Sequence, residues 1–225
     1  MDVIKQLDVT SPDRRTAEPR WPAVVASIAV AGLYLALPTS LTFVPGWLLL
    51  GIVVLLLAPI IVARRKGNHK LNEIFGYVLL SVLTLAMAGS LALLVAGLPT
   101  HKESPKALLI SAAALWSTNV LVFASWYWRL DAGGPNMRDQ RGEHVDGAFF
   151  FPQMMMNAET KAATGETCWS PGFVDYLFLA FNASTAFSPT DAPVLSRWAK
   201  LMMMVQSSIS LMTIALLAAR AVNIL

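Results

Sequence analysis

The chain has 225 residues, of which 56% are hydrophobic and only 14% are charged, and its mean hydropathy is +0.56. Because a soluble domain carries roughly 25% charged residues, this composition excludes a soluble enzyme and predicts a protein embedded in a lipid bilayer. The net charge of +3 and the pI near 9.2 do not indicate nucleic acid binding. The basic residues flank apolar stretches, where they are placed to meet anionic lipid head groups.

Residues 1–21 form a polar N-terminal tail that mixes basic side chains, such as Arg14 and Arg15, with acidic ones. The apolar run that follows is longer than the roughly 7–15 residues of a signal-peptide core. We therefore expect an exposed tail and not a cleavable signal.

Five apolar runs reach the length of roughly 17–25 residues that crosses a bilayer as a helix. They are Pro22 to Phe43, Trp47 to Ala63, Ile74 to Leu98 and Ala107 to Trp128, all within a first membrane region at 22–128, and Ala199 to about Val222. Charged residues fall between these runs, because one ionised residue at the bilayer centre costs roughly 2.5–3.5 kcal/mol. The predicted fold class is all-α, an integral membrane helical bundle with about five transmembrane helices.

A polar loop at 129–171 separates the fourth and fifth runs. Within it, the aromatic triplet 149–151 is too short to cross a membrane, so we expect it to lie at the interface or to pack on the bundle. The last region, 172–225, begins with an apolar stretch from Phe173 to Phe187 of about 15 residues, which is short for a span. It predicts one short re-entrant or half-buried helix before the final transmembrane helix.

The distribution of Lys and Arg predicts the orientation in the membrane. The tail and the link at 64–70 each hold four such residues, whereas the first turn holds none and the third link only Lys102 and Lys106. Since cytoplasmic loops are the basic ones, we expect the tail, the 64–70 link and the 129–171 loop in the cytoplasm and the C-terminus outside.

The fifth run carries polar residues on one helical face: Gln206, Ser210, Thr213 and Arg220 follow one another at spacings of four, three and seven. Two interpretations remain open. The stripe lines a water-filled path, or it makes hydrogen bonds between helices, worth roughly 0.6 kcal/mol each in membranes. Because no Asp or Glu lies in the middle of a run, proton-coupled transport is disfavoured.

Catalytic and metal-binding motifs are missing from the sequence. It contains no nucleophile elbow and no phosphate loop, its three histidines lie in three different links, and the single Cys168 cannot build a cysteine metal site. We therefore expect no enzyme activity, no cofactor and no metal. An acid–base cluster of His144 with Glu143 and Asp146 is a third-ranked alternative, because solvated charges are much commoner in such loops.

The segment from Asp175 to Arg197 resembles a family of bacterial inner-membrane proteins catalogued as domain of unknown function 1345. Residues that match the family pattern are Asp175, Phe181, Asp191, Ser196 and Arg197, whereas Ser184, Ala186 and Ser188 stand where the family usually has Gly, Thr and Gln. The resemblance covers roughly the whole chain and is specific in the last third. It implies a multi-pass protein of the bacterial cytoplasmic membrane and brings no established activity.

The order of short helix, polar segment and final helix is also similar to the pore module of potassium channels, whose filters are rings of backbone carbonyls. In that register, residues 186–191 correspond to the filter. Ser188 and Thr190 replace its two glycines and Pro189 fixes its own φ, so potassium selectivity is not expected. The predicted orientation also makes this segment enter from the cytoplasm, opposite to a potassium channel.

Two function classes follow. The first is a channel-like transport protein for an undefined ion or solute, assembled as a homo-oligomer, a tetramer if it is pore-like. Its candidate pore-lining residues are Asp175, Ser184, Ser188, Thr190, Asp191, Gln206, Ser210 and Thr213. The second is a non-transporting membrane protein whose 129–171 loop docks a partner. Oligomeric state distinguishes the two classes.

Overall fold

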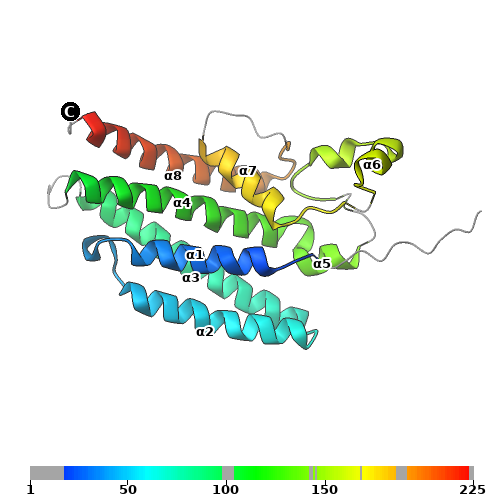
Figure 1. Cartoon of the computed structure of the whole chain (residues 1–225), viewed down its shortest axis with the longest axis horizontal. Coiled ribbons are helices and arrows are strands. Elements are labelled where there is room, and N and C mark those ends of the chain that lie inside the picture. Colours follow the sequence, from blue (N-terminus) through cyan, green and yellow to red (C-terminus); the bar gives the residue numbers. More distant parts are fainter. Residues whose placement is uncertain are drawn as a thin grey trace, which may run out of the picture.

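The computed structural model describes residues 18–97, 104–141, 144, 146–167, 169–185 and 192–222. Over these residues the chain is built from helices, and its β-structure is limited to one isolated antiparallel bridge between Phe149 and Val194. The long helices lie side by side along the longest axis of the molecule (Figure 1).

Five helices run along the bundle: α1 (Trp21–Leu35), α2 (Gly46–Arg65), α3 (His69–Gly97), α4 (Pro105–Leu130) and α8 (Arg197–Val222). Of these, α2, α3, α4 and α8 are long and apolar enough to cross a membrane. Large apolar side chains such as Leu55, Leu85 and Leu201 are mostly exposed on their outer faces. Such a surface suits hydrocarbon and not water, so the fold agrees with a membrane protein.

The first predicted span is shorter than the sequence indicated. It was expected to run to Phe43, but α1 ends at Leu35, and residues Thr39–Leu41 form a separate 3₁₀ turn. Pro38 explains this end, because the residue before a proline is disfavoured in the helical conformation. At 1.5 Å per residue, α1 is about 22 Å long, against about 30 Å for the hydrocarbon of a bilayer.

The 129–171 loop packs on one end of the bundle. It contains the short helices α5 (Pro135–Gln140) and α6 (Ala158–Thr164) and the 3₁₀ turns Asp131–Gly133 and Pro152–Met155. Phe149 and Phe151 are buried in the main core, with ring centroids 5.2 Å from Tyr127 and 5.5 Å from Tyr176, respectively. The prediction that the aromatic triplet packs on the bundle is therefore confirmed for these two residues.

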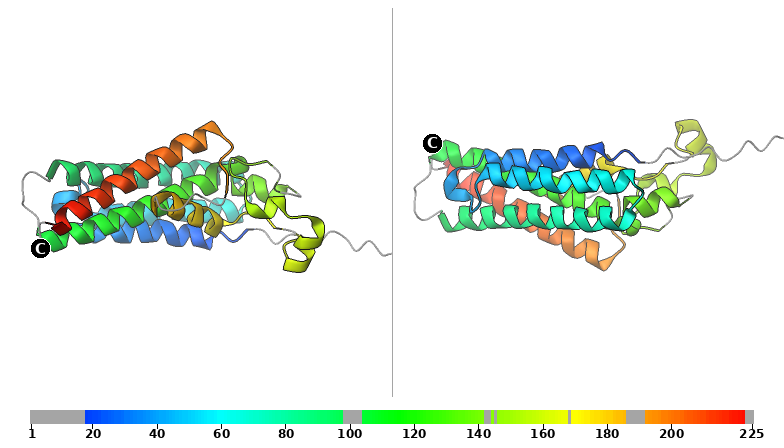
Figure 2. Two further views of the ribbon diagram at one scale, coloured as in Figure 1. Left: turned by 90° about the horizontal axis from the view of Figure 1, so that it is seen from above. Right: turned by 90° about the horizontal axis from the view of Figure 1, so that it is seen from below.

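Helix α7 (Phe173–Thr185) covers only part of the length of the bundle. It starts at the end where α4 terminates and lies between α4 and α8, and α8 crosses the other helices obliquely (Figures 1 and 2). After α7 the chain is back at the same end: Phe150 N donates to Pro193 O at 2.9 Å, and Leu195 N donates to Ala148 O at 2.7 Å.

Nearly all the described Lys and Arg side chains lie at one end of the bundle. We call it the basic end; it comprises the starts of α1, α7 and α8, the α2–α3 turn, the end of α4, and helices α5 and α6. Among the described side chains, Lys106 is the only Lys or Arg that lies elsewhere. The tail, the 64–70 link and the 129–171 loop were predicted to share one side of the membrane, and the described parts of all three lie at this end.

Candidate functional site

Gln206, in the middle of α8, joins three helices. Its side chain is fully buried. Nε2 donates to Ala180 O and to Ser184 Oγ on α7, both at 2.7 Å, and Oε1 accepts from Tyr127 Oη on α4 at 2.6 Å. These three bonds set the depth of α7 between α4 and α8.

The polar stripe of α8 continues this junction. Asn119 on α4 donates through Nδ2 to Ser210 Oγ at 2.8 Å and to Gln206 O at 3.1 Å, and Thr213 Oγ1 donates to Ile209 O at 2.8 Å. Ser210 and Thr213 are fully buried, like Gln206, so the three share a face as their spacing predicts. Within the single chain, therefore, Gln206 and Ser210 make hydrogen bonds between helices, as in the second interpretation, whereas Thr213 bonds within α8 and the side chain of Arg220 lies outside the described part of the structure.

The other predicted site residues are partly dispersed. Asp175 lies in the first turn of α7, where its Oδ2 accepts from Gly172 N at 2.7 Å. It is nine residues before Ser184, which at 1.5 Å per residue is about 14 Å along the helix. Ser188, Thr190 and Asp191 lie outside the described residues. The structure thus brings together Ser184, Gln206 and Ser210, with Thr213 one turn further along α8, and places Asp175 at the basic end.

A cluster around Asp131 ties the end of α4 to the start of α7. The Asp131 carboxylate is fully buried and accepts from Tyr176 Oη at 2.6 Å and from the backbone N–H of Ala148. His144 Nε2 lies 3.7 Å from the same carboxylate. Gly147 allows this approach, because a Cβ there would lie 3.0 Å from both Asp131 Oδ1 and His144 Nε2. We call these residues the Asp131 cluster.

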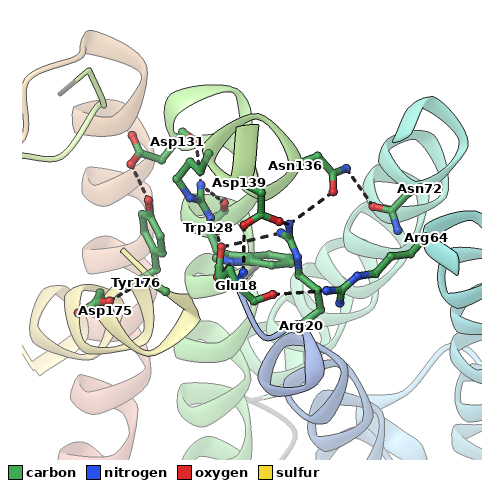
Figure 3. A network of polar contacts seen from close by, with 12 residues as sticks. Glu18, Arg20, Arg64, Asn72, Trp128, Asp131, Asn136, Asp139, Asp175 and Tyr176 are labelled. Atoms are coloured by element: carbon green, nitrogen blue, oxygen red, sulfur yellow. Dashed lines mark hydrogen bonds and ion pairs between the residues drawn. The ribbon is translucent and has the colours of Figure 1, made fainter. Parts of the chain in front are cut away.

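Arg138 extends the Asp131 cluster toward α1, and Figure 3 shows Glu18, Arg20 and Asp139 gathered there beside Trp128. Its Nη1 donates to Trp128 O at 2.8 Å and to Asp131 O at 2.9 Å, and its Nη2 meets Glu18 Oε2 at 3.1 Å. Glu18 also accepts from Trp128 Nε1, and Arg20 next to it pairs with Asp139. Charged hydrogen bonds therefore join α4, α5 and α7 to the residues just before α1 at this end of the bundle.

His144 is surrounded differently from the sequence-based alternative. Its ring is buried, faces Asp131, and lies edge-on to Trp169 at a centroid distance of 6.3 Å. Asp146 instead pairs with Arg141, and Glu143 lies outside the described residues. Burial lowers the pKa of His144, the Asp131 carboxylate opposes this shift, and Arg138 adds to it. Burial therefore favours the neutral form of the histidine, which lies in an interior contact.

The sequence offered no signal for the Asp131 cluster. Asp131 and Tyr176 are 45 positions apart. Asp131 directly follows the end of α4 and Tyr176 lies in the first turns of α7, positions where such residues are common. In the part of the chain that the structure describes, no three His, Cys, Asp or Glu residues gather to hold a metal ion. The resemblance to the bacterial inner-membrane family remains a prediction. No family model, curated protein or solved structure matches this chain.

Proposed function

We propose that the chain is a multi-pass membrane transport protein of channel-like type, in which α7 is a re-entrant helix beside the path of an ion or small solute. One observation carries the proposal. Helix α7 leaves the basic end, stops at the level of Gln206, and the chain is back at the basic end by Pro193. The bacterial cytoplasmic membrane, as the family resemblance implies, is the proposed location.

The depth of α7 follows from its partners. Ser184 near its end meets Gln206, nine residues into α8, and Ser184 O accepts from Trp116 Nε1 on α4 at 3.4 Å. At 1.5 Å per residue, Gln206 lies about 14 Å from the start of α8, or about half of a 30 Å hydrocarbon layer. Interrupted helices that end near this depth are where membrane transporters form their substrate sites.

The carbonyls near the end of α7 have partners from neighbouring helices. Ala180 O accepts from Gln206, Ala183 O accepts from Ser207 Oγ at 2.9 Å, and Ser184 O accepts from Trp116. A helix can end inside a membrane only when its last polar groups are satisfied by protein or water. The partial negative charge of a helix C-terminus at this depth favours a cation as the transported species.

The outer face of α7 supports assembly from several chains. Val174 and Phe178 are mostly exposed in the single chain. Asp175 and Asn182 on the same helix line a cavity of about 230 Å³. An apolar surface interrupted by polar groups beside a cavity suits a homo-oligomer in which α7 helices approach a common axis, and the potassium-channel resemblance implies four copies.

Flux into liposomes tests the proposal. We expect purified protein to carry monovalent cations at a rate above that of empty liposomes. We expect Asp191→Ala to lower the flux at least tenfold and Glu159→Ala, which removes a carboxylate from the exposed α6, to leave it unchanged. Equal leakage from empty and protein-loaded liposomes, for several ions, would refute transport.

Docking of a partner is the second candidate, and α6 favours it. Helix α6 has no buried residue, whereas the rest of the described 129–171 loop contributes several buried side chains. It is capped by Asn157, whose Oδ1 accepts from Thr160 N at 2.7 Å, and ends at Gly165 with a φ of 77°. Docking would be supported by two results together: the protein shows no flux, and a protein that co-purifies with it is lost when Glu159 and Lys161 are replaced.

A further inference from the structure

A second cavity, of about 430 Å³, opens at the basic end between α1, α2, α3 and α4. It lies on the other side of the bundle from the Gln206 junction and shares no residue with it. Its polar lining residues are Arg20, Ser27, Arg64, Arg65, Asn72, Ser125, Arg129 and Asn136. The cavity is therefore a site separate from the Gln206 junction.

The lining carries positive charge without matching negative charge. It includes four arginines and no carboxylate. Arg20 pairs with Asp139 and lies 3.8 Å from Glu18, neither of which lines the cavity. Among the described residues, no carboxylate lies within 4.0 Å of the guanidinium groups of the other three arginines. The cavity thus has a positive electrostatic potential suited to an anion.

Arg129 is the most deeply buried of these cations, and its guanidinium lies over the rings of Tyr77 and Trp128 without a carboxylate partner. It is only 9% exposed, and its guanidinium lies against the backbone of Gly76, where a Cβ would come within 2.0 Å of Cζ. Its Nε has no hydrogen-bond partner among the described residues, and Nη1 reaches only Asn72 O, at 3.5 Å. Burying a charge with so few partners is costly, so a bound anion would be strongly stabilising here.

The wall of the cavity becomes apolar away from the arginines. Leu57 lies two helical turns before Arg64 on α2, and Leu80 lies one turn beyond Gly76 on α3. Among its apolar lining residues, Trp21 is 67% exposed and Ile61 is 41% exposed. In a bilayer these two residues face lipid, so the cavity opens to the membrane with its charged end at the head-group level.

We propose that this cavity binds an anionic phospholipid, with the phosphate among Arg64, Arg65 and Arg129 and an acyl chain along Leu57 and Leu80. Basic pockets between transmembrane helices on the cytoplasmic side are suited to anionic head groups. Arginine matches phosphate oxygens through paired N–H donors, and the apolar wall provides for the chain. Inorganic phosphate has the phosphate oxygens but no acyl chain, and phosphatidylcholine has both but carries no net negative charge.

Binding is measured on the full chain in detergent, by thermal stability against increasing phosphatidylglycerol, phosphatidylcholine or inorganic phosphate. We expect phosphatidylglycerol to raise the melting temperature at the lowest concentration. In Arg64→Gln/Arg65→Gln, we expect the concentration needed to rise about tenfold or more, because each arginine near an anionic head group contributes to affinity. Arg64 and Arg65 are exposed, so this variant keeps the fold.

Arg197→Gln/Lys200→Gln is the matched control, because it removes the same charge from exposed positions of α8 at the same end. We expect it to respond like the unmodified protein.

Gly76→Ala displaces the Arg129 guanidinium and is expected to weaken the response while Arg64 and Arg65 remain. An equal loss in both double variants would show a diffuse charge effect and overturn the site. An equal response to phosphatidylcholine would exclude anion recognition, and a full response to inorganic phosphate alone would exclude a lipid ligand.

Discussion

Gln206 shows how one polar residue organises the interior of an apolar bundle. Its amide makes three hydrogen bonds to α4 and α7, and its backbone carbonyl receives a fourth from Asn119. In hydrocarbon an unpaired amide cannot form hydrogen bonds with water. These bonds therefore fix the register of the helices as well as stabilising them. Leucine of similar size packs the space but fixes no register.

Gln206→Leu is expected to destabilise the protein by about 2 kcal/mol. The reason is that about 0.6 kcal/mol is lost for each of three interhelical bonds, with a further cost for the Tyr127 hydroxyl left buried without its acceptor. Unfolding in mixed micelles measures the effect. Ser208→Ala is the control, because Ser208 is exposed and donates only to Met204 O within its own helix. Equal stability of the two variants would contradict the role assigned to Gln206.

The buried His144 is expected to make stability depend on pH. Its folded-state pKa is lowered by burial, so as the pH falls below about 6.5 the unfolded chain takes up a proton before the folded chain does. Stability is therefore complete above that pH and decreases below it, with a slope of at most about 1.4 kcal/mol per pH unit.

Melting temperatures between pH 8 and pH 5, for the unmodified protein and for His144→Gln, test this dependence. Burial raises the pKa of Asp175, which acts in the opposite direction as the pH falls, but Asp175 is common to both proteins. The difference between the two curves therefore isolates the histidine. Parallel curves would show that His144 does not titrate in the unfolding transition.

At the scale of elements, α7 is held at both ends by contacts of different kinds. Its end is fixed by neutral bonds to Gln206, and its start by the hydrogen bond from Tyr176 to the buried Asp131 carboxylate. Arg138 lies over the Tyr176 ring with its Cζ 5.1 Å from the ring centroid. A helix of 13 residues is too short to be stable alone, so its position depends on these tertiary contacts.

Tyr176→Phe is expected to loosen α7 more than any other helix. A hydrogen bond to a charged group contributes about 1.5–3 kcal/mol, and its loss leaves the Asp131 carboxylate with fewer donors. Hydrogen exchange of backbone amides is the measurement: peptides from 173–185 should exchange faster, and peptides from α2 should be unchanged. Uniform acceleration over all helices would mean that the bond supports global stability and not the placement of α7.

At the scale of the whole molecule, the sequence predicts the long helices within a few residues. A helix that crosses hydrocarbon needs an apolar run of about 20 residues, and such a run can be read from the sequence without knowledge of tertiary contacts. The first run is the exception, since Pro38 ends α1 within an apolar stretch. The Asp131 cluster and the arginine-lined cavity could not be predicted. Each joins side chains from three or more elements far apart in sequence, and only packing brings them together.

The sidedness of the basic end is the remaining property of the whole bundle that can be tested directly. Basic loops are retained in the cytoplasm, so all exposed positions at this end should be labelled from one side of the membrane. In a Cys168→Ser background, single cysteines at Lys66 and Lys161 should react with an impermeant maleimide only in inside-out vesicles. A cysteine at Thr39, which is exposed at the opposite end in the turn between α1 and α2, should react only in right-side-out vesicles.

Labelling of Lys66→Cys and Lys161→Cys from different sides would contradict the helix packing, whereas labelling of both from outside would keep the packing and reverse the orientation. In that second case α7 would enter from outside, as in potassium channels, and the arginine-lined cavity would face the outer leaflet.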